Sequence, residues 1–204
     1  MNRYQQTIQI YREQWKEFIK ILAHVSPKEL PIFAKLIKRN GRVLDVGSAG
    51  GRDAKRFVKF GLHVVGIDVV DEFLREARRS VPQAKFIKMD VRRLKFPKNY
   101  FDAVWANAVL LHFDKRTAGK VVKLFYKVLR PAGKLAVGVK MGKGHSFTTD
   151  GNSPSRSRFF SYWSQVELER MLKKSGFKII RSKISPDMRR RKNVKWVKVW
   201  GEKS

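Results

Sequence analysis

The sequence predicts an α/β fold with a doubly wound, mostly parallel sheet covered by helices on both faces. Short apolar segments of strand character alternate with amphipathic helical segments between residues 42 and 140. Such alternation is typical of parallel strands joined by crossover helices. The first strand also runs into a turn of small residues, Gly47 to Gly51, that opens a helix. Small residues beside the unpaired N–H groups of a helix start favour a nucleotide-like ligand at that strand end.

Length and composition predict one domain, residues 1–204, with a sizeable core. The chain is 43% hydrophobic, which excludes a disordered chain. No apolar run approaches the roughly 20 residues that span a bilayer, and the first residues do not form a signal peptide. The absence of cysteine excludes disulfides, zinc–cysteine sites and iron–sulfur clusters. We therefore expect a cytoplasmic, monomeric protein that uses no metal.

The charge of the chain is strongly positive. There are 46 Lys and Arg residues against 17 Asp and Glu residues, which gives a formal net charge of +29. Such a charge attracts polyanions. A basic surface also serves solubility alone, and the net charge does not decide between these two roles.

Residues 1–40 are expected to form a helical N-terminal extension. Apolar residues from Ile8 to Leu22 recur at spacings of three and four, which is one face of a helix. Ser26-Pro27 is expected to begin a second helix, with the serine as N-cap. Asn40-Gly41 is expected to end that helix.

The cofactor-binding core is expected over residues 41–140, and the pattern there assigns each element in turn. The expected strands cover residues 42–46, 63–68, 84–88, 101–106 and 133–140, and the expected helices cover 51–60, 71–79 and 115–129.

The remaining third of the chain is expected to carry a loop, a helix and two strands. Residues 141–157 are rich in Gly, Ser and Thr and poor in apolar residues, so we expect a loop. A loop of this length suggests a substrate lid, and residues 141–163 are therefore assigned to the substrate side. Residues 164–204 should form a helix starting near Ser164 and two strands, 177–184 and 194–200.

Carboxylates follow two of the expected strands. Asp68 ends the second strand, and Asp90 comes just after the third. Either residue alone reads most simply as a cap, of the helix near Asp71 or of the turn before Arg92. Both together at the carboxyl ends of parallel strands favour a ligand site.

Five ordered motifs carry a resemblance to a known family. They are Val43-Leu-Asp-Val-Gly-Ser-Ala-Gly-Gly51, Gly66-Ile-Asp68, Phe86-Ile-Lys-Met-Asp90, Tyr100-Phe-Asp-Ala-Val-Trp-Ala106 and Leu129-Arg-Pro-Ala-Gly-Lys-Leu135. Together they resemble the class I methyltransferases that depend on S-adenosylmethionine (SAM), in particular small stand-alone enzymes of the type 11/25 kind. One departure is Ala49, which replaces the middle glycine of the family's G-x-G-x-G.

The resemblance implies a seven-stranded sheet of order 3-2-1-4-5-7-6 with an antiparallel last strand, and an N-terminal helical lid. It implies that SAM is bound and S-adenosylhomocysteine (SAH) released. Asp45 would meet the methionyl ammonium, Asp68 both ribose hydroxyls, and Asp90 with Val91 the adenine. Arg52 and Asp53 either reach the methionyl carboxylate or pair with each other, and Tyr11 either closes over the cofactor or packs on the core. The remaining implied cofactor residues are Gly47, Ser48, Ala49, Gly51, Val69, Ala106 and Asn107.

The methyl acceptor is less readable from the sequence. His112 is the first candidate for a general base and His145 in the expected loop is the second, because imidazole titrates near neutral pH. A histidine in an apolar stretch is also commonly a packed residue. The segment after Trp105 lacks the prolines and aromatic of exocyclic-amine methyltransferases, so methylation of adenine or cytosine amines is disfavoured.

Two acceptors and one non-enzymatic role therefore stay open. A small-molecule acceptor follows from the resemblance to compact enzymes. RNA is favoured by the net charge and by Arg189, Arg190, Arg191 and Lys192, which fall between the last two strands. This basic run is otherwise a solvated hairpin tip. The third role is that of a SAM-binding accessory protein without turnover.

Overall fold

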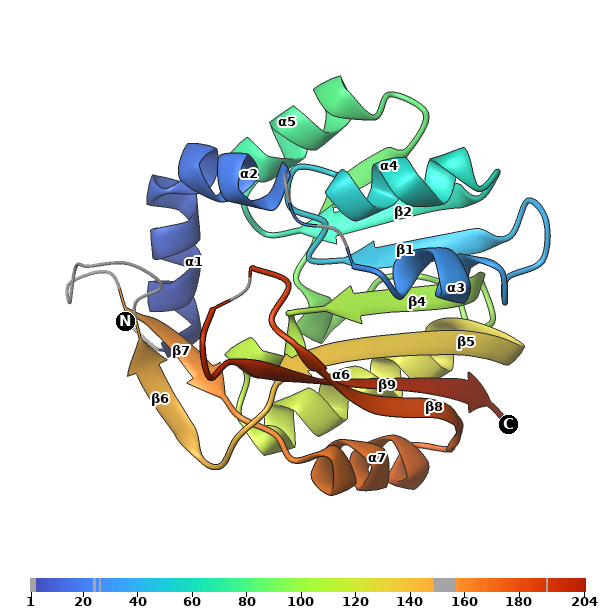
Figure 1. Ribbon diagram of the computed structural model, residues 1–204. Coiled ribbons are helices and arrows are strands. Elements are labelled where there is room, and N and C mark those ends of the chain that lie inside the picture. The colour runs from blue at the N-terminus through green and yellow to red at the C-terminus, as the bar shows by residue number, and fades with distance from the viewer. Residues whose placement is uncertain (1–2, 24, 26, 149–156, 190) are drawn as a thin grey trace.

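The protein is built around one seven-stranded sheet (Figure 1). The computed structural model describes residues 3–23, 25, 27–148, 157–189 and 191–204. The strands lie in the order β3-β2-β1-β4-β5-β9-β8. Their bounds are β1 Arg42–Val46, β2 His63–Asp68, β3 Lys85–Lys88, β4 Phe101–Asn107, β5 Leu129–Lys140, β8 Phe177–Pro186 and β9 Lys195–Lys203.

The predicted strand order is confirmed, because β8 and β9 are the sixth and seventh strands of this sheet. The first five strands pair in parallel, and β9 runs antiparallel to both β5 and β8. Since β8 is therefore parallel to β5, the loop between β8 and β9 emerges at the carboxyl ends of the parallel strands. This placement brings the basic run to the same edge of the sheet as the glycine turn.

Helices cover both faces of the sheet (Figure 1). Helices α4 (Arg52–Lys59) and α5 (Asp71–Ser80) lie on one face with α3 (Leu30–Ala34), and α6 (Lys115–Val128) and α7 (Gln165–Lys174) lie on the other. Two short 3-10 turns, η1 (Val91–Arg93) and η2 (Leu110–His112), connect elements on the α6 face. Each layer buries its apolar stripe against the sheet, the dominant stabilising contribution in such folds.

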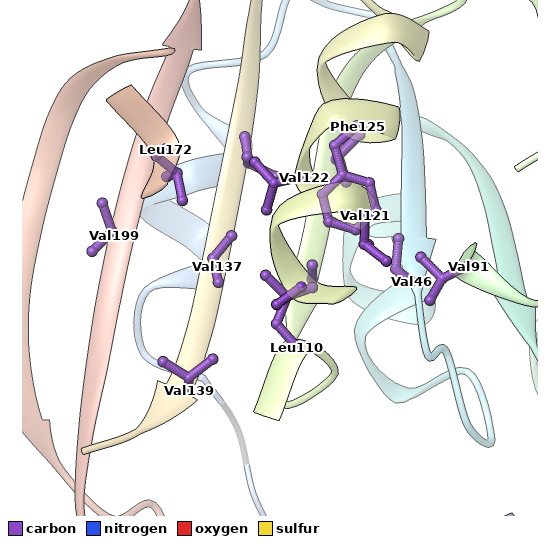
Figure 2. Close-up of a cluster of buried hydrophobic side chains, with 14 of the residues drawn as sticks. Val46, Val91, Leu110, Val121, Val122, Phe125, Val137, Val139, Leu172 and Val199 are labelled. Carbon is purple, nitrogen blue, oxygen red and sulfur yellow. The ribbon is translucent and has the colours of Figure 1, made fainter. Parts of the chain in front are cut away.

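The larger core lies between the sheet and α6 and α7. Figure 2 shows apolar side chains of α6, α7 and the strands meeting there. Phe125 is fully buried in this cluster, and its replacement by alanine would cost about 3–5 kcal/mol. The cluster includes Val46, Val91, Leu110, Val121, Val122, Phe125, Val137, Val139, Leu172 and Val199. This core fixes the strand ends that carry the site.

The N-terminal extension is helical as expected, but its third helix begins later than predicted. Helices α1 (Arg3–Glu13) and α2 (Trp15–Ala23) pack on α5 and on the hairpin described below. The expected N-cap Ser26 lies outside the described residues, and α3 begins at Leu30. The Glu29 side chain makes no cap bond, because it pairs instead with Lys183 and Lys198 at 2.7 and 2.6 Å.

The prediction of a loop over 141–157 is wrong in part. Residues His145–Thr148 form β6, which pairs antiparallel with β7, Arg158–Ser161. The strands are short and carry mixed polar and aromatic residues, so their periodicity is weak in the sequence. The residues between Thr148 and Ser157 lie outside the described part of the chain.

The helix expected near Ser164 is confirmed. Helix α7 begins with a capping box, in which Ser164 Oγ accepts from the Glu167 N–H and Glu167 accepts from the Ser164 N–H. Across the described residues, no helix is both long and apolar enough to cross a membrane.

Candidate functional site

A cavity of about 620 Å³ lies at the carboxyl ends of the parallel strands. Its walls come from the ends of β1, β2, β4 and β5, and from α1, α2, β7 and the β8–β9 loop. In Figure 1 the arrowheads of β1 and β4 point toward this region, which α1 and the β6–β7 hairpin face. The volume suits a cofactor-sized ligand, and the position is the one at which open α/β sheets bind ligands.

The glycine turn adopts the left-handed backbone that its residue types favour. Gly47 has φ +66° and Gly51 has φ +81°, and both line the cavity. A Cβ on Gly47 would lie 2.6 Å from Val109 Cγ2, so this position admits only glycine. Ala49 also has a positive φ of +44°, which costs about 1–2 kcal/mol for a residue with a Cβ. The alanine that departs from the family motif thus keeps the glycine-type backbone.

Three buried polar atoms on this side of the cavity have no hydrogen-bond partner among the described residues. They are Asp45 Oδ2, Ser48 Oγ and Arg52 Nη1. Burial, together with the nearby Asp53 carboxylate, raises the pKa of Asp45 well above its usual value. A cation beside Asp45 would relieve this cost. A carboxylate, a hydroxyl and a guanidinium in one wall form a donor set that fits a zwitterion.

Arg52 and Asp53 pair with each other, which was one of the two expected arrangements. Arg52 Nε and Nη2 donate to the two Asp53 oxygens at 2.7 and 3.0 Å. Asp53 Oδ2 also accepts from Trp105 Nε1 at 2.9 Å. The pair holds the guanidinium at the cavity wall and leaves Nη1 toward a ligand.

Asp68 ties two turns together at the end of β2. Oδ1 accepts from the N–H groups of Val69 and Val70 at 2.7 and 3.0 Å, and Oδ2 accepts from Ala49 at 3.0 Å. Burial raises the pKa of Asp68, although these three bonds act in the opposite direction. The side chain makes no cap bond to α5, whose N-cap is Val70.

Not every expected cofactor residue reaches the cavity. Ala49, Val69, Val91 and Asn107 line it, whereas Ala106 is fully buried in the core. Asp90 lies outside the lining, where it caps η1 through the Arg92 N–H and accepts from the Arg92 guanidinium. The cap expected as the alternative for Asp90 is therefore present.

His112 belongs to a hydrogen-bonded network that crosses the cavity. Its Nδ1 lies 3.0 Å from the Phe159 carbonyl oxygen and its Nε2 lies 2.9 Å from the Tyr11 hydroxyl. Because a carbonyl only accepts, Nδ1 carries the proton, and Nε2 of the neutral ring accepts from Tyr11. Arg158 Nη1 in turn donates to the Tyr11 oxygen at 2.6 Å. Tyr11 packs on Phe18 and also lines the cavity, so it combines both expected roles.

His145, the second base candidate, is placed differently from the expectation. It lies on β6, is exposed, and is absent from the cavity lining. Its ring contacts Phe159, with centroids 5.6 Å apart. The strand that replaces the expected loop carries this histidine away from the site. Nowhere in the described chain do three His, Asp or Glu side chains gather as metal ligands would.

Sequence reasoning missed two cations of the cavity wall, Lys140 and Arg158. Lys140 ends β5 and Arg158 begins β7, and they are 7% and 4% exposed. Lys140 occupies the carboxyl end of a parallel strand, as Asp68 does, and this position was a usable signal. Arg158 had no comparable signal, because β7 was not predicted.

The basic loop contributes to the cavity mouth, but one of its cations has a structural role. Arg189 and Arg191 line the cavity. Arg191 Nε and Nη2 donate to the two oxygens of Asp187 at 2.9 Å each, and Trp196 Nε1 donates to Oδ1 at 2.8 Å. Burial opposes ionisation of Asp187, but the Arg191 and Trp196 bonds lower its pKa to about 2. Arg190 lies outside the described residues.

Comparisons with known proteins agree with this geometry. Residues 44–137 match the model of a family described as a methyltransferase domain. The chain is 30% identical over 105 residues to a phosphoethanolamine N-methyltransferase of Plasmodium falciparum, covering 50% of this chain and 40% of the relative. It is 35% identical over 108 residues to a sterol 24-C-methyltransferase of Aspergillus fumigatus, covering 50% of this chain and 28% of the relative. The chain thus spans less than half the length of these curated relatives.

Solved structures extend the likeness to the whole fold. A Burkholderia thailandensis 1,6-didemethyltoxoflavin-N1-methyltransferase with bound SAH superposes with a TM-score of 0.76 at 18% identity, covering 100% of this chain and 92% of that one. A [4+2]-cyclase superposes with a TM-score of 0.78 at 17% identity, covering 99% and 97%. Taken with the family match and the strand order, these likenesses place the chain in the class I, Rossmann-fold, SAM-dependent methyltransferases.

Proposed function

We propose that this protein transfers the methyl group of SAM to a small-molecule acceptor bound next to His112. The observation that carries the proposal is the set of unpartnered buried atoms of Asp45, Ser48 and Arg52. Polar groups buried in a protein are normally hydrogen-bonded, so this set calls for a ligand. The ammonium and carboxylate of the methionyl group supply the complementary charges.

The residues of the chain divide the work of binding. Asp45 accepts from the ammonium, Arg52 Nη1 donates to the carboxylate, and Asp68 accepts from a ribose hydroxyl. Val69 and Val91 offer apolar surface for the adenine. When bound, SAM supplies an activated methyl carbon that is open to in-line displacement. The protein contributes mainly by orienting the acceptor and excluding water.

His112 and Tyr11 are proposed to handle the proton of the acceptor. Nε2 of the neutral His112 ring is a base held against the Tyr11 hydroxyl. Arg158 donates to the same hydroxyl, and a neighbouring cation favours the phenolate. An acceptor N–H or O–H near Tyr11 can therefore lose its proton through Tyr11 to His112.

A small acceptor is favoured over RNA by the cover of the cavity. Thr7 Oγ1 accepts from the Phe159 N–H at 3.1 Å, which binds α1 to the hairpin. Tyr4 packs on Phe113 with centroids 4.9 Å apart, which closes the cavity farther along the same helix. The relatives named above carry names of small-molecule enzymes. RNA stays as the second candidate because of the basic loop at the mouth.

The test begins with SAH binding measured by calorimetry. Asp45→Asn should weaken SAH binding about tenfold or more, since a charged hydrogen bond contributes about 1.5–3 kcal/mol. Asp102→Asn is the matched control, because Asp102 lies outside the cavity lining and pairs with Lys38 and Arg130. Unchanged affinity in Asp45→Asn would remove the glycine turn from the cofactor site.

Methyl transfer itself is tested with labelled SAM and fractionated cell metabolites. We expect labelled product in a low-mass fraction, and Tyr11→Phe should bind SAH normally while losing most turnover. Label found only in RNA would select the second candidate. Because a [4+2]-cyclase shares the fold, SAH binding without any labelled product would favour a role other than methyl transfer.

A further inference from the structure

Two buried cations share one aromatic ring on the acceptor side of the cavity. Lys140 Nζ lies 3.6 Å from the centroid of the Phe160 ring, and Arg158 Cζ lies 5.2 Å from it. All three residues line the cavity and are less than 9% exposed. The two positive charges are therefore neighbours in a wall that is largely removed from bulk water.

The carboxylate of this wall is already engaged. Among the described lining residues, Asp187 is the one acidic side chain contributed by β5, β7, β9 or the β8–β9 loop. Its two oxygens accept from Arg191 and Trp196. The other lining carboxylates, Asp45, Asp53, Asp68 and Glu76, come from β1, β2, α4 and α5 on the cofactor side. The acceptor side thus carries a surplus of positive charge.

We propose that Lys140 and Arg158 bind an anionic group, a phosphate or a carboxylate, of the methyl acceptor. This inference rests on the proposed function and adds the chemical class of the acceptor. A buried cation is costly in isolation, whereas an anion placed beside it forms strong, poorly screened hydrogen bonds. An arginine and a lysine together offer several donors to the oxygens of one such group.

The position of the cations bounds the size of the acceptor. The His112 ring centroid lies 5.2 Å from that of Phe160, so the candidate base and both cations surround the same ring. The anionic group and the atom that receives the methyl group must therefore lie within a few bonds of each other. This places the anion within a small metabolite.

Lys140 is the cleaner residue for a test, because Arg158 also supports Tyr11. The protein is saturated with SAH, and inorganic phosphate and acetate are titrated separately by calorimetry at constant ionic strength. Lys140→Met should weaken binding of the preferred anion by about tenfold or more, the effect of losing a charged hydrogen bond. Lys140→Arg should keep affinity within about threefold, because it keeps the charge and the donors. The anion that binds more tightly distinguishes a phosphate from a carboxylate acceptor.

Lys115→Met is the matched control. Lys115 Nζ also stacks on an aromatic ring, 3.5 Å from the Trp163 centroid, but Lys115 is outside the cavity lining. Its replacement removes one charge from a chain of net charge +29 and should leave the specific anion affinity unchanged. SAH affinity should be equal in parent, Lys140→Met and Lys115→Met.

The outcomes separate this inference from the proposed function. SAH binding with no measurable affinity for either anion, or equal loss in Lys140→Met and Lys115→Met, overturns the anion site and leaves the cofactor site standing. Absence of SAH binding to the parent overturns both. A tenfold loss confined to Lys140→Met, with Lys140→Arg intact, supports the anion site.

Discussion

Asp68 gives the sharpest test of the cofactor site, because its carboxylate faces the cavity and also holds two turns. Three backbone N–H groups already donate to it. A carboxylate has about four acceptor positions, and both positions of Oδ1 are occupied by Val69 and Val70. One position on Oδ2 remains beside the bond from Ala49. The expectation that Asp68 accepts from both ribose hydroxyls is therefore reduced to one.

The structure sets the size of the expected effect. Asp68→Asn keeps the shape of the side chain but replaces one oxygen with an NH₂ group and removes the charge. Loss of one charged hydrogen bond costs about 1.5–3 kcal/mol, so SAH should bind roughly 10- to 150-fold more weakly. One of the three backbone N–H groups also loses its acceptor, which should lower the free energy of unfolding by about 1–3 kcal/mol. Asp68→Ala would strand all three, so asparagine is the better variant.

The assay combines calorimetry with SAH and urea unfolding of the ligand-free protein. Asp71→Asn is the control, because this neighbouring carboxylate pairs with Lys88 and lies outside the cavity lining. Asp71→Asn should leave SAH affinity unchanged. A folded Asp68→Asn variant that binds SAH within twofold of the parent would refute the reasoning and leave Asp68 with only its structural role.

Three further predictions follow from single contacts. Gly47→Ala should abolish measurable SAH binding and destabilise the protein, because its Cβ would meet Val109 at 2.6 Å, whereas Gly61→Ala, at φ +72° with open space around it, should keep binding in calorimetry. Arg189→Ser with Lys192→Ser should leave thermal stability and SAH affinity unchanged, and a loss of either would show that these cations support the fold. Burial opposes ionisation of Glu29, but Lys183 and Lys198 outweigh it and lower its pKa to about 2 from 4.5, so its pairs contribute about 3 kcal/mol above pH 4.5 that disappears as pH falls toward 2; urea unfolding of Glu29→Gln should lack this acid-dependent part of the slope.

The sequence was most informative where local chemistry decides the structure. The glycine turn and the capping box of Ser164 depend on residues within a few positions of one another, and both were located correctly. Strand β2 matched its predicted bounds, since its apolar run ends abruptly at Asp68. Strand β5 begins four residues earlier than predicted, because Leu129 pairs with Phe101 ahead of a register shift. That pairing depends on a neighbour 28 residues away and has no local signal.

Tertiary contacts explain what the sequence did not predict. The β6–β7 hairpin has two strands of four residues, too short for a clear alternation of apolar and polar side chains. Without β7, neither the cover of the cavity nor Arg158 could be inferred. Arg191 read as one cation in a solvated run, yet its partner Asp187 is buried. A charge run does not reveal which of its members has a buried partner.

The network of Tyr11, His112 and Arg158 joins three segments that have no relation in the sequence. Tyr11 comes from the first helix, His112 from the turn after β4, and Arg158 from the hairpin. Each bond in the network is therefore also a bond between the cover and the core, and it forms only when α1 lies over the cavity. Since His112 Nδ1 is held by the Phe159 carbonyl, the hairpin fixes the tautomer that leaves Nε2 basic. Closure of the cover and preparation of the candidate base are thus one structural event, which restricts proton removal to the state in which water is excluded.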